Sequence, residues 1–175
     1  MNKRLFFALD ISANDKQTIA YWRDQTLKLP FKAITKNNFH ITLAFLGNTN
    51  AEQQQKLING ANILARPITA NKNNELQLDH IGLFKKPKVM YLGLHTCPNW
   101  LHDLANNLSK AALAVDLHQE NRPYCPHLSI YRKATPITHH YAVNFSLVIK
   151  SFSLYQSISQ KTGVTYCPIN TWQLR

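Results

Sequence analysis

Two short segments of the chain repeat one order of residue types. Residues 39–43 read Phe-His-Ile-Thr-Leu and residues 126–130 read Pro-His-Leu-Ser-Ile, so that each has a histidine, an apolar residue, a hydroxyl residue and a second apolar residue. His40 and His127 lie 87 residues apart, about half of the 175-residue chain. A single copy of this pattern is common by chance. Two copies at this spacing favour two equivalent halves that each contribute one copy.

Both segments have the composition of β-strands, and this gives the pattern a geometric meaning. Side chains two residues apart in a strand point to the same face. His40 and Thr42 therefore share one face, and His127 and Ser129 share the corresponding face of the second strand. If the two strands lie side by side, two imidazoles and two hydroxyls line one cleft.

Such a cleft suits acid–base chemistry at a phosphoester. A neutral imidazole accepts a proton from the attacking hydroxyl or water, and a protonated imidazole donates one to the leaving oxygen. The ordinary histidine pKa of about 6.5 allows both states near neutral pH. The hydroxyls of Thr42 and Ser129 can donate hydrogen bonds to the phosphoryl oxygens. This chemistry requires no metal, and we predict none.

Arg132 and Tyr124 are further candidates for substrate binding. Arg132 could provide a fixed cation, but it follows His127 by five residues, which is the opposite face of a regular strand. It must reach the cleft through a bulge or at the strand end. Tyr124 could stack on a base or pack in the core. Tyr131 is bulky for a position so close to the motif, and core packing is expected for Phe45.

The remaining histidines give no convincing metal site. His139 and His140 are adjacent and would point to opposite sides of a strand, so a surface loop is the better interpretation. His80 and His95 are scattered in the sequence and are interpreted as structural or solvent-facing.

Hydrophobic periodicity predicts alternating strands and helices, hence an α+β or mixed α/β fold. A capping box at Thr49 and Glu52 marks one helix start. The expected strands are 4–9, 39–46, 75–83, 88–94, 127–132, 143–157, 164–166 and 171–174, where residues 143–157 form either one long strand or two strands with a bend. The expected helices are 14–27, 51–65 and 98–115.

The composition is that of a basic globular protein. Hydrophobic residues make up 45%, and 20 Lys and Arg against nine Asp and Glu give a formal net charge of +11. A strongly cationic surface favours a polyanionic partner such as nucleic acid. The three cysteines form no disulfide framework, and no apolar run is long enough to span a bilayer. We therefore expect a cytoplasmic protein that does not enter a membrane, and a monomer.

The motifs resemble those of the two-histidine (2H) phosphoesterases, and within them the RNA 2′,3′-cyclic phosphodiesterases, once called bacterial 2′-5′ RNA ligases. The resemblance covers nearly the whole chain and rests on an opening strand, the first motif, a central hairpin and the second motif with its closing arginine, which are residues 4–10, 38–47, 82–94 and 122–132. Ser129 and Ile130 depart from the family pattern, which usually has threonine and leucine there.

This resemblance implies a single domain over residues 1–175. The domain is bilobal, with two pseudo-symmetric antiparallel sheets flanked by helices and a basic cleft between the lobes. It implies hydrolysis of an RNA 2′,3′-cyclic phosphate end to a 2′-phosphate without a cofactor. His40 would protonate the departing 3′ oxygen, His127 would activate water, and Thr42 and Ser129 would hold the phosphate.

Other functions stay open from the sequence. The chain could be a basic RNA-binding module without turnover, although binding alone needs cations more than imidazoles. It could also act on small cyclic nucleotides or on 2′-5′ linkages. The reverse reaction, 2′-5′ ligation of RNA, uses the same transition state and is also open.

Overall fold

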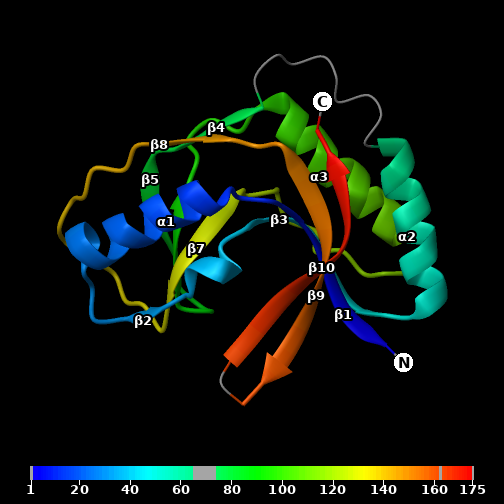
Figure 1. The fold of residues 1–175 in the computed structure, drawn as a ribbon, viewed down its shortest axis with the longest axis horizontal. Helices are drawn as coiled ribbons and strands as arrows, with labels where there is room; N and C mark the ends of the chain where they lie inside the picture. Colours follow the sequence, from blue (N-terminus) through cyan, green and yellow to red (C-terminus); the bar gives the residue numbers. More distant parts are fainter. Residues whose placement is uncertain (1, 65–73, 162, 175) are drawn as a thin grey trace.

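The structure is a computed structural model that describes residues 2–64, 74–161 and 163–174. In chain order its strands and helices are β1 (Lys3–Leu9), α1 (Ala13–Trp22), β2 (Lys32–Ala33), β3 (Ile41–Thr49), α2 (Ala51–Leu64), β4 (Glu75–Leu78), β5 (His80–Phe84), β6 (Val89–Gly93), α3 (Asn99–Leu113), β7 (His127–Arg132), β8 (Phe145–Val148), β9 (Ser151–Gln160) and β10 (Gly163–Gln173). Figure 1 shows α1 on one side of the strands, and α2 and α3 together on the other.

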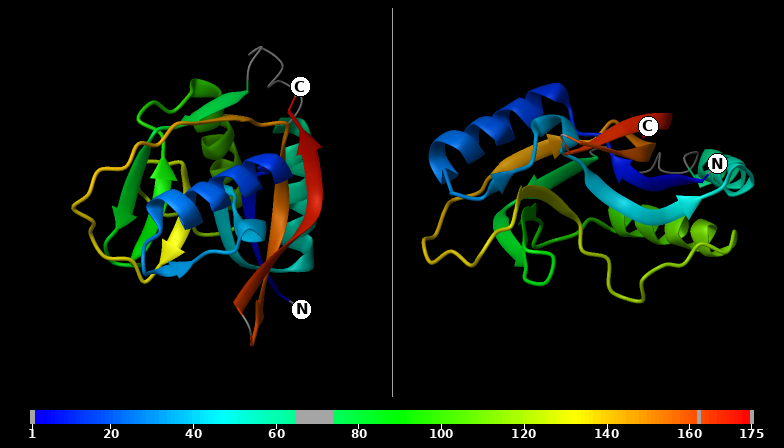
Figure 2. Two further views of the ribbon diagram at one scale, coloured as in Figure 1. Left: turned by 60° about the vertical axis from the view of Figure 1, so that its left-hand side comes forward. Right: turned by 90° about the horizontal axis from the view of Figure 1, so that it is seen from below.

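The strands form one large antiparallel sheet and one small one. The large sheet has eight strands in the order β10-β9-β1-β3-β7-β6-β5, with β2 added to β7, and the small sheet pairs β4 with β8. β3 and β7 meet at a single register pair, Ile41 with Leu128. The large sheet is therefore two half-sheets that touch at their inner strands and diverge from there, as the two views of Figure 2 show.

This arrangement confirms the α+β class and its antiparallel strands. The two predicted sheets are the halves β10-β9-β1-β3 and β7-β6-β5. Hydrophobic periodicity does not indicate which strands form their junction, because pairing between distant strands leaves no periodic signal. The small β4–β8 sheet is an addition to the expected fold.

Helix α3 shows how the apolar stripes support the sheet. Its buried residues recur at helical spacing along one face, and α3 packs against both β3 and α2. The buried residues of this stripe are Trp100, Leu101, Leu104, Ala105, Leu108 and Ala112. None of the helices in the described part of the chain is both long and apolar enough for a membrane span.

Several predicted boundaries were wrong for local reasons. The first helix ends at Trp22 and continues as a π-helical turn to Leu27, where Lys28 closes it with a positive φ of 42°. The strand expected to stop at Gly47 runs on to Thr49. Asn50 and Gln53, one residue later than predicted, form the capping box of α2 through reciprocal side chain–backbone hydrogen bonds.

Two further strand assignments differ. Asp79 interrupts the strand predicted over residues 75–83, which is β4 followed by β5. Of the two alternatives for residues 143–157, the structure has the second, two strands, which are β8 and β9. Conversely, the two short strands expected at the end of the chain are one strand, β10, because it follows β9 along its length.

Candidate active site

The two histidine motifs lie on neighbouring strands, which is the condition under which the sequence analysis expected their side chains to share one cleft. The strands meet at one register pair, Ile41 with Leu128, and each of these residues directly follows a motif histidine. The charge of His127 lowers the pKa of His40, so the two imidazoles lie near each other.

Each imidazole is held by a backbone carbonyl two residues before it. His40 Nδ1 donates to the carbonyl oxygen of Asn38 at 2.7 Å, and His127 Nδ1 donates to that of Cys125 at 2.8 Å. A carbonyl oxygen only accepts, so the proton of each neutral ring lies on Nδ1 and leaves Nε2 as a base. His40 Nε2 lies 3.1 Å from Thr42 Oγ1, which donates to it. The rings are thus fixed in the same tautomer in both halves.

A β-bulge follows each motif at the same position. Between β1 and β3, Phe7 pairs with Ala44 and Ala8 with Thr42, so Leu43 is the extra residue. Between β6 and β7, Met90 pairs with Tyr131 and Tyr91 with Ser129, so Ile130 is the extra residue.

The bulge in β7 decides where the next two side chains point. Ile130 and Tyr131 are both buried, although neighbours in a regular strand alternate. Arg132, one residue later, is exposed and lies close enough for its charge to lower the pKa of His40. The sequence analysis required a bulge or the strand end for Arg132 to approach the cleft, and Arg132 lies both after a bulge and at the end of β7. Tyr131 points into the core and leaves the cleft free.

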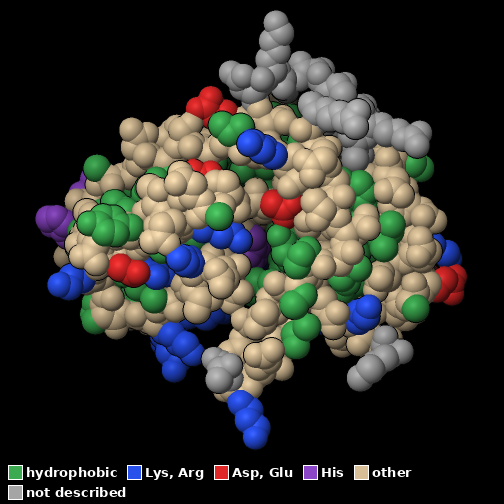
Figure 3. All heavy atoms as spheres, viewed as in Figure 1, with side chains coloured by type: hydrophobic (Ala, Val, Ile, Leu, Met, Phe, Trp, Pro, Cys, Tyr) green, Lys and Arg blue, Asp and Glu red, His purple; other side chains and the backbone are tan. Residues whose placement is uncertain are grey.

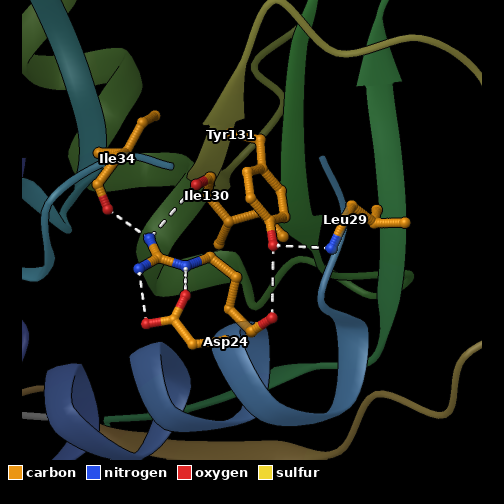
Figure 4. A network of polar contacts seen from close by, with 6 residues as sticks. Asp24, Leu29, Ile34, Ile130 and Tyr131 are labelled. Carbon is orange, nitrogen blue, oxygen red and sulfur yellow. Dashed lines mark hydrogen bonds and ion pairs between the residues drawn. The ribbon is translucent and has the colours of Figure 1, made fainter. Parts of the chain in front are cut away.

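A buried arginine donates a hydrogen bond to the bulge residue Ile130. Arg23, only 5% exposed, donates from Nη1 to the carbonyl oxygens of Ile34 and, at 3.4 Å, Ile130. The Tyr131 hydroxyl in turn donates to the Arg23 carbonyl and accepts from the Leu29 amide at 3.2 Å. Asp24 pairs with the guanidinium of Arg23, and Figure 4 shows this network around the end of β7.

Aromatic side chains enclose both imidazoles. The His40 ring lies 5.0 Å from Phe6 and 5.0 Å from Tyr166, measured between ring centroids. The His127 ring lies 4.8 Å from Phe84 and 5.4 Å from Tyr91. The sequence analysis missed these four residues, because a single aromatic residue in a strand carries no sign of the face to which it points.

Burial keeps both imidazoles neutral. It lowers the pKa of His40 from 6.5 to about 4, opposed by the hydrogen bond to Asn38 and assisted by the positive charges of His127, Lys16 and Arg132. Burial also lowers the pKa of His127, with a contribution from the charge of Arg122. In Figure 3 a histidine is visible in a hollow, with Lys and Arg side chains on one side of it and hydrophobic side chains on the other. The charges that act on the two imidazoles include those of Lys16, Arg132 and Arg122.

Lys16 was also missed at the sequence level. Its ammonium group lies 3.4 Å from the Asn37 carbonyl oxygen, just before the first motif. Burial lowers its pKa, with the charge of Asp10 opposing that effect. In sequence it is the single lysine of a polar helix, 24 residues before His40, and only the fold brings it to the motif.

Tyr124 makes a structural contact with the first motif. Its hydroxyl donates to the Thr42 carbonyl oxygen at 3.0 Å, and burial raises its pKa. The residue thereby ties the segment before β7 to β3. Phe45, by contrast, is 50% exposed with Arg4 stacked over its ring at 5.2 Å, so the expected core packing was wrong.

Comparisons with known proteins agree with this geometry. Residues 9–91 match the family described as LigT like phosphoesterase. The chain is 32% identical to the RNA 2′,3′-cyclic phosphodiesterase of Escherichia coli (strain K12), over 98% of this chain and 97% of the relative. It is 29% identical to the protein of the same name from Methanocaldococcus jannaschii, over 97% and 99% of the two chains. The crystal structure of E. coli LigT complexed with 3′-AMP matches with a TM-score of 0.84 and 31% identity, over 99% of both chains. The chain therefore belongs to the LigT-like phosphoesterase family of two-histidine proteins.

Proposed function

We propose that this protein hydrolyses 2′,3′-cyclic phosphodiester ends of RNA to 2′-phosphomonoesters. The observation that carries the proposal is a pair of imidazoles beside adjoining strands, each held through Nδ1 by the carbonyl oxygen two residues before it. Each is followed two residues later by a hydroxyl residue. Full-length relatives that bear the name of this activity support it.

The phosphate would sit between the two motifs. Thr42 and Ser129 hydroxyls would donate to its non-bridging oxygens, and the charges of Arg132 and Lys16 would offset its negative charge. These donors are held by strands and bulges before substrate arrives, so little reorganisation accompanies binding.

His127 is the better placed base. The burial that lowers its pKa keeps it neutral at pH 7, with Nε2 free to accept a proton. Its surroundings are more exposed than those of His40, which gives water access to it. His127 would take a proton from water as the water oxygen bonds to phosphorus.

His40 would act as the acid. As the P–O3′ bond breaks, its Nε2 proton passes to the 3′ oxygen, and the phosphate stays on the 2′ oxygen. The free ring is neutral because its pKa is about 4. An anionic phosphate beside the ring raises that pKa by opposing the nearby positive charges. Substrate binding would therefore be accompanied by uptake of a proton from solvent on His40 Nε2. After the product leaves, His127 releases to solvent the proton it took from water, and the next substrate to bind brings His40 its proton again, so both rings are restored.

The deciding experiment uses an oligonucleotide with a 2′,3′-cyclic phosphate end and identifies the product. A 2′-phosphate is expected, with activity unchanged in EDTA because no step above involves a metal. H40A and H127A should each lower kcat by roughly 10²–10⁴-fold, while H118A, which alters an exposed histidine outside the motifs, should not. A double variant H40A/H127A with wild-type turnover would exclude the mechanism. Binding without any product would instead indicate an RNA-binding module.

Three further properties belong to the same proposal. We infer one catalytic domain over residues 1–175, because β9 and β10 return to the half-sheet that β1 and β3 begin. We also infer a monomer whose site is complete in one chain, and a cytoplasmic location that suits the free Cys97, Cys125 and Cys167.

A further inference from the structure

A second cluster of titratable side chains lies at the outer strands, β5 and β6, of the half-sheet β7-β6-β5. Asp79, between β4 and β5, accepts hydrogen bonds on Oδ1 from His80 Nδ1 at 2.8 Å and from His95 Nδ1 at 2.7 Å. The centroids of the two imidazole rings are 4.3 Å apart. One donor atom from each of the three residues lies within 4.8 Å of the other two.

The backbone, rather than chance side-chain positions, assembles this cluster. The Asp79 amide donates to the Gly93 carbonyl oxygen at 2.9 Å, and the His95 amide donates to the Asp79 carboxylate at 3.1 Å. His80 pairs with Gly93 across β5 and β6. A Cβ atom on Gly93 would lie 2.6 Å from the His80 ring, so this glycine makes room for the imidazole.

The cluster opens into a cavity of about 450 Å³. Asp79, His80 and His95 line one part of it, and the segment from Pro136 to Tyr141 lines another. Lys85 also borders the cavity. The side chains of Asp79 and His80 are each 30% exposed and that of His95 is 69% exposed, so an ion from solvent can reach all three.

We propose that Asp79, His80 and His95 bind a divalent transition metal ion, with Zn²⁺ as the representative. Two imidazoles and one carboxylate are a common ligand set for this class of ion, and water would complete the coordination. Bonds of about 2.0–2.1 Å in a tetrahedral site place ligand atoms about 3.3 Å apart. The distances from Asp79 Oδ1 to the two Nδ1 atoms are 2.8 and 2.7 Å, so each needs to lengthen by only about half an ångström. On binding, the Nδ1 proton of each ring is displaced by the metal and Nε2 carries the ring proton, so that both histidines coordinate as neutral imidazoles.

The proposed metal site is separate from the proposed phosphodiesterase site. The Tyr91 ring stands between the two sites, 6.4 Å from His80 and 5.4 Å from His127 between centroids. His40 and His127 contribute no ligand to the metal. The inference therefore stands whether or not the phosphodiesterase proposal holds.

Zn²⁺ binding can be measured by competition with a chromophoric chelator. We expect one tight site per chain that H95N and D79N each weaken. Removing a residue that merely orients a metal ligand costs about 10–100-fold in affinity, so loss of a ligand should cost at least tenfold. H118N is the matched control, since His118 is exposed and lies outside the cavity. Circular dichroism checks that each variant folds.

A second measurement needs no variant. In the wild-type protein, the ring ¹⁵N signals of His80 and His95 should shift on addition of Zn²⁺, whereas those of His40 should stay in place at one equivalent. The proposal is wrong if the wild-type chain takes up no stoichiometric Zn²⁺, if H95N and D79N bind like H118N, or if the ring signals of His80 and His95 do not move.

Discussion

Leu43 and Ile130 are equivalent residues: each is the extra residue of a β-bulge, and each follows its motif histidine by three positions. The bulges turn two successive side chains into the core after each motif. In β7 this brings Arg132 to the cleft, whereas the corresponding residue of β3 is Phe45. The two halves are thus alike in how they orient imidazole and hydroxyl, and they differ in the side chain that follows.

The hydroxyl of Ser129 should contribute strongly to turnover. S129A removes one donor to the phosphoryl oxygens, and loss of such a donor lowers kcat by roughly 10²–10³-fold. S129T keeps the hydroxyl and restrains its rotamer, so it should retain activity or raise it. Steady-state kinetics on the cyclic-phosphate oligonucleotide measures both. Equal losses in S129A and S129T would point to packing rather than to hydrogen bonding.

His40 should make the protein less stable in mild acid. The pKa of the ring is 6.5 in the unfolded chain and about 4 in the folded one, so between these values the unfolded state binds more protons. The free energy of unfolding therefore falls as the pH drops from 6.5 towards 4 and is unaffected by this group above 6.5. H40Q should remove on the order of 1–3 kcal/mol of that pH dependence. Urea denaturation across pH 4.5–7.5 provides the comparison, and parallel curves for the two proteins would contradict the prediction.

Anion binding should raise the pKa of His40. Inorganic phosphate in the cleft offsets the positive charges of Lys16 and Arg132 that help to lower it. An NMR titration of the His40 ring with and without phosphate should show an upward shift in the presence of the anion. In R132Q, the ring should titrate at a higher pH without phosphate, because one of those charges is gone. No movement in either experiment would remove the electrostatic basis for His40 as the acid.

Arg23 should matter for stability far more than its neighbour Asp24. R23M deprives the buried carbonyl oxygens of Ile34 and Ile130 of a charged donor, which should lower the free energy of unfolding by about 1–3 kcal/mol. Asp24 is half exposed, so D24N should cost well under that. Chemical denaturation of both variants measures the difference. If R23M and D24N cost the same, the support of the bulge by Arg23 is refuted.

The sequence alone determined the elements and the chemistry of the site. The repeated His-x-Thr/Ser pattern depends only on strand periodicity, which is local, and so it placed His40 with Thr42 and His127 with Ser129 before any coordinates. The amphipathic stripes located all three helices to within a few residues, except where α1 changes to a π-helical turn.

Tertiary structure decided what depends on residues far apart in the chain. The pairing of Ile41 with Leu128 joins strands from different halves, and no local pattern encodes it. The bulge that brings Arg132 to the cleft and buries Tyr131 depends on the partner strand β6 and on Arg23. Asp79, His80 and His95 come together only when β5 and β6 pair, so in the sequence they were scattered histidines and a lone acid. Local periodicity fixes which face of a strand a side chain takes, but long-range pairing fixes which side chains it meets there.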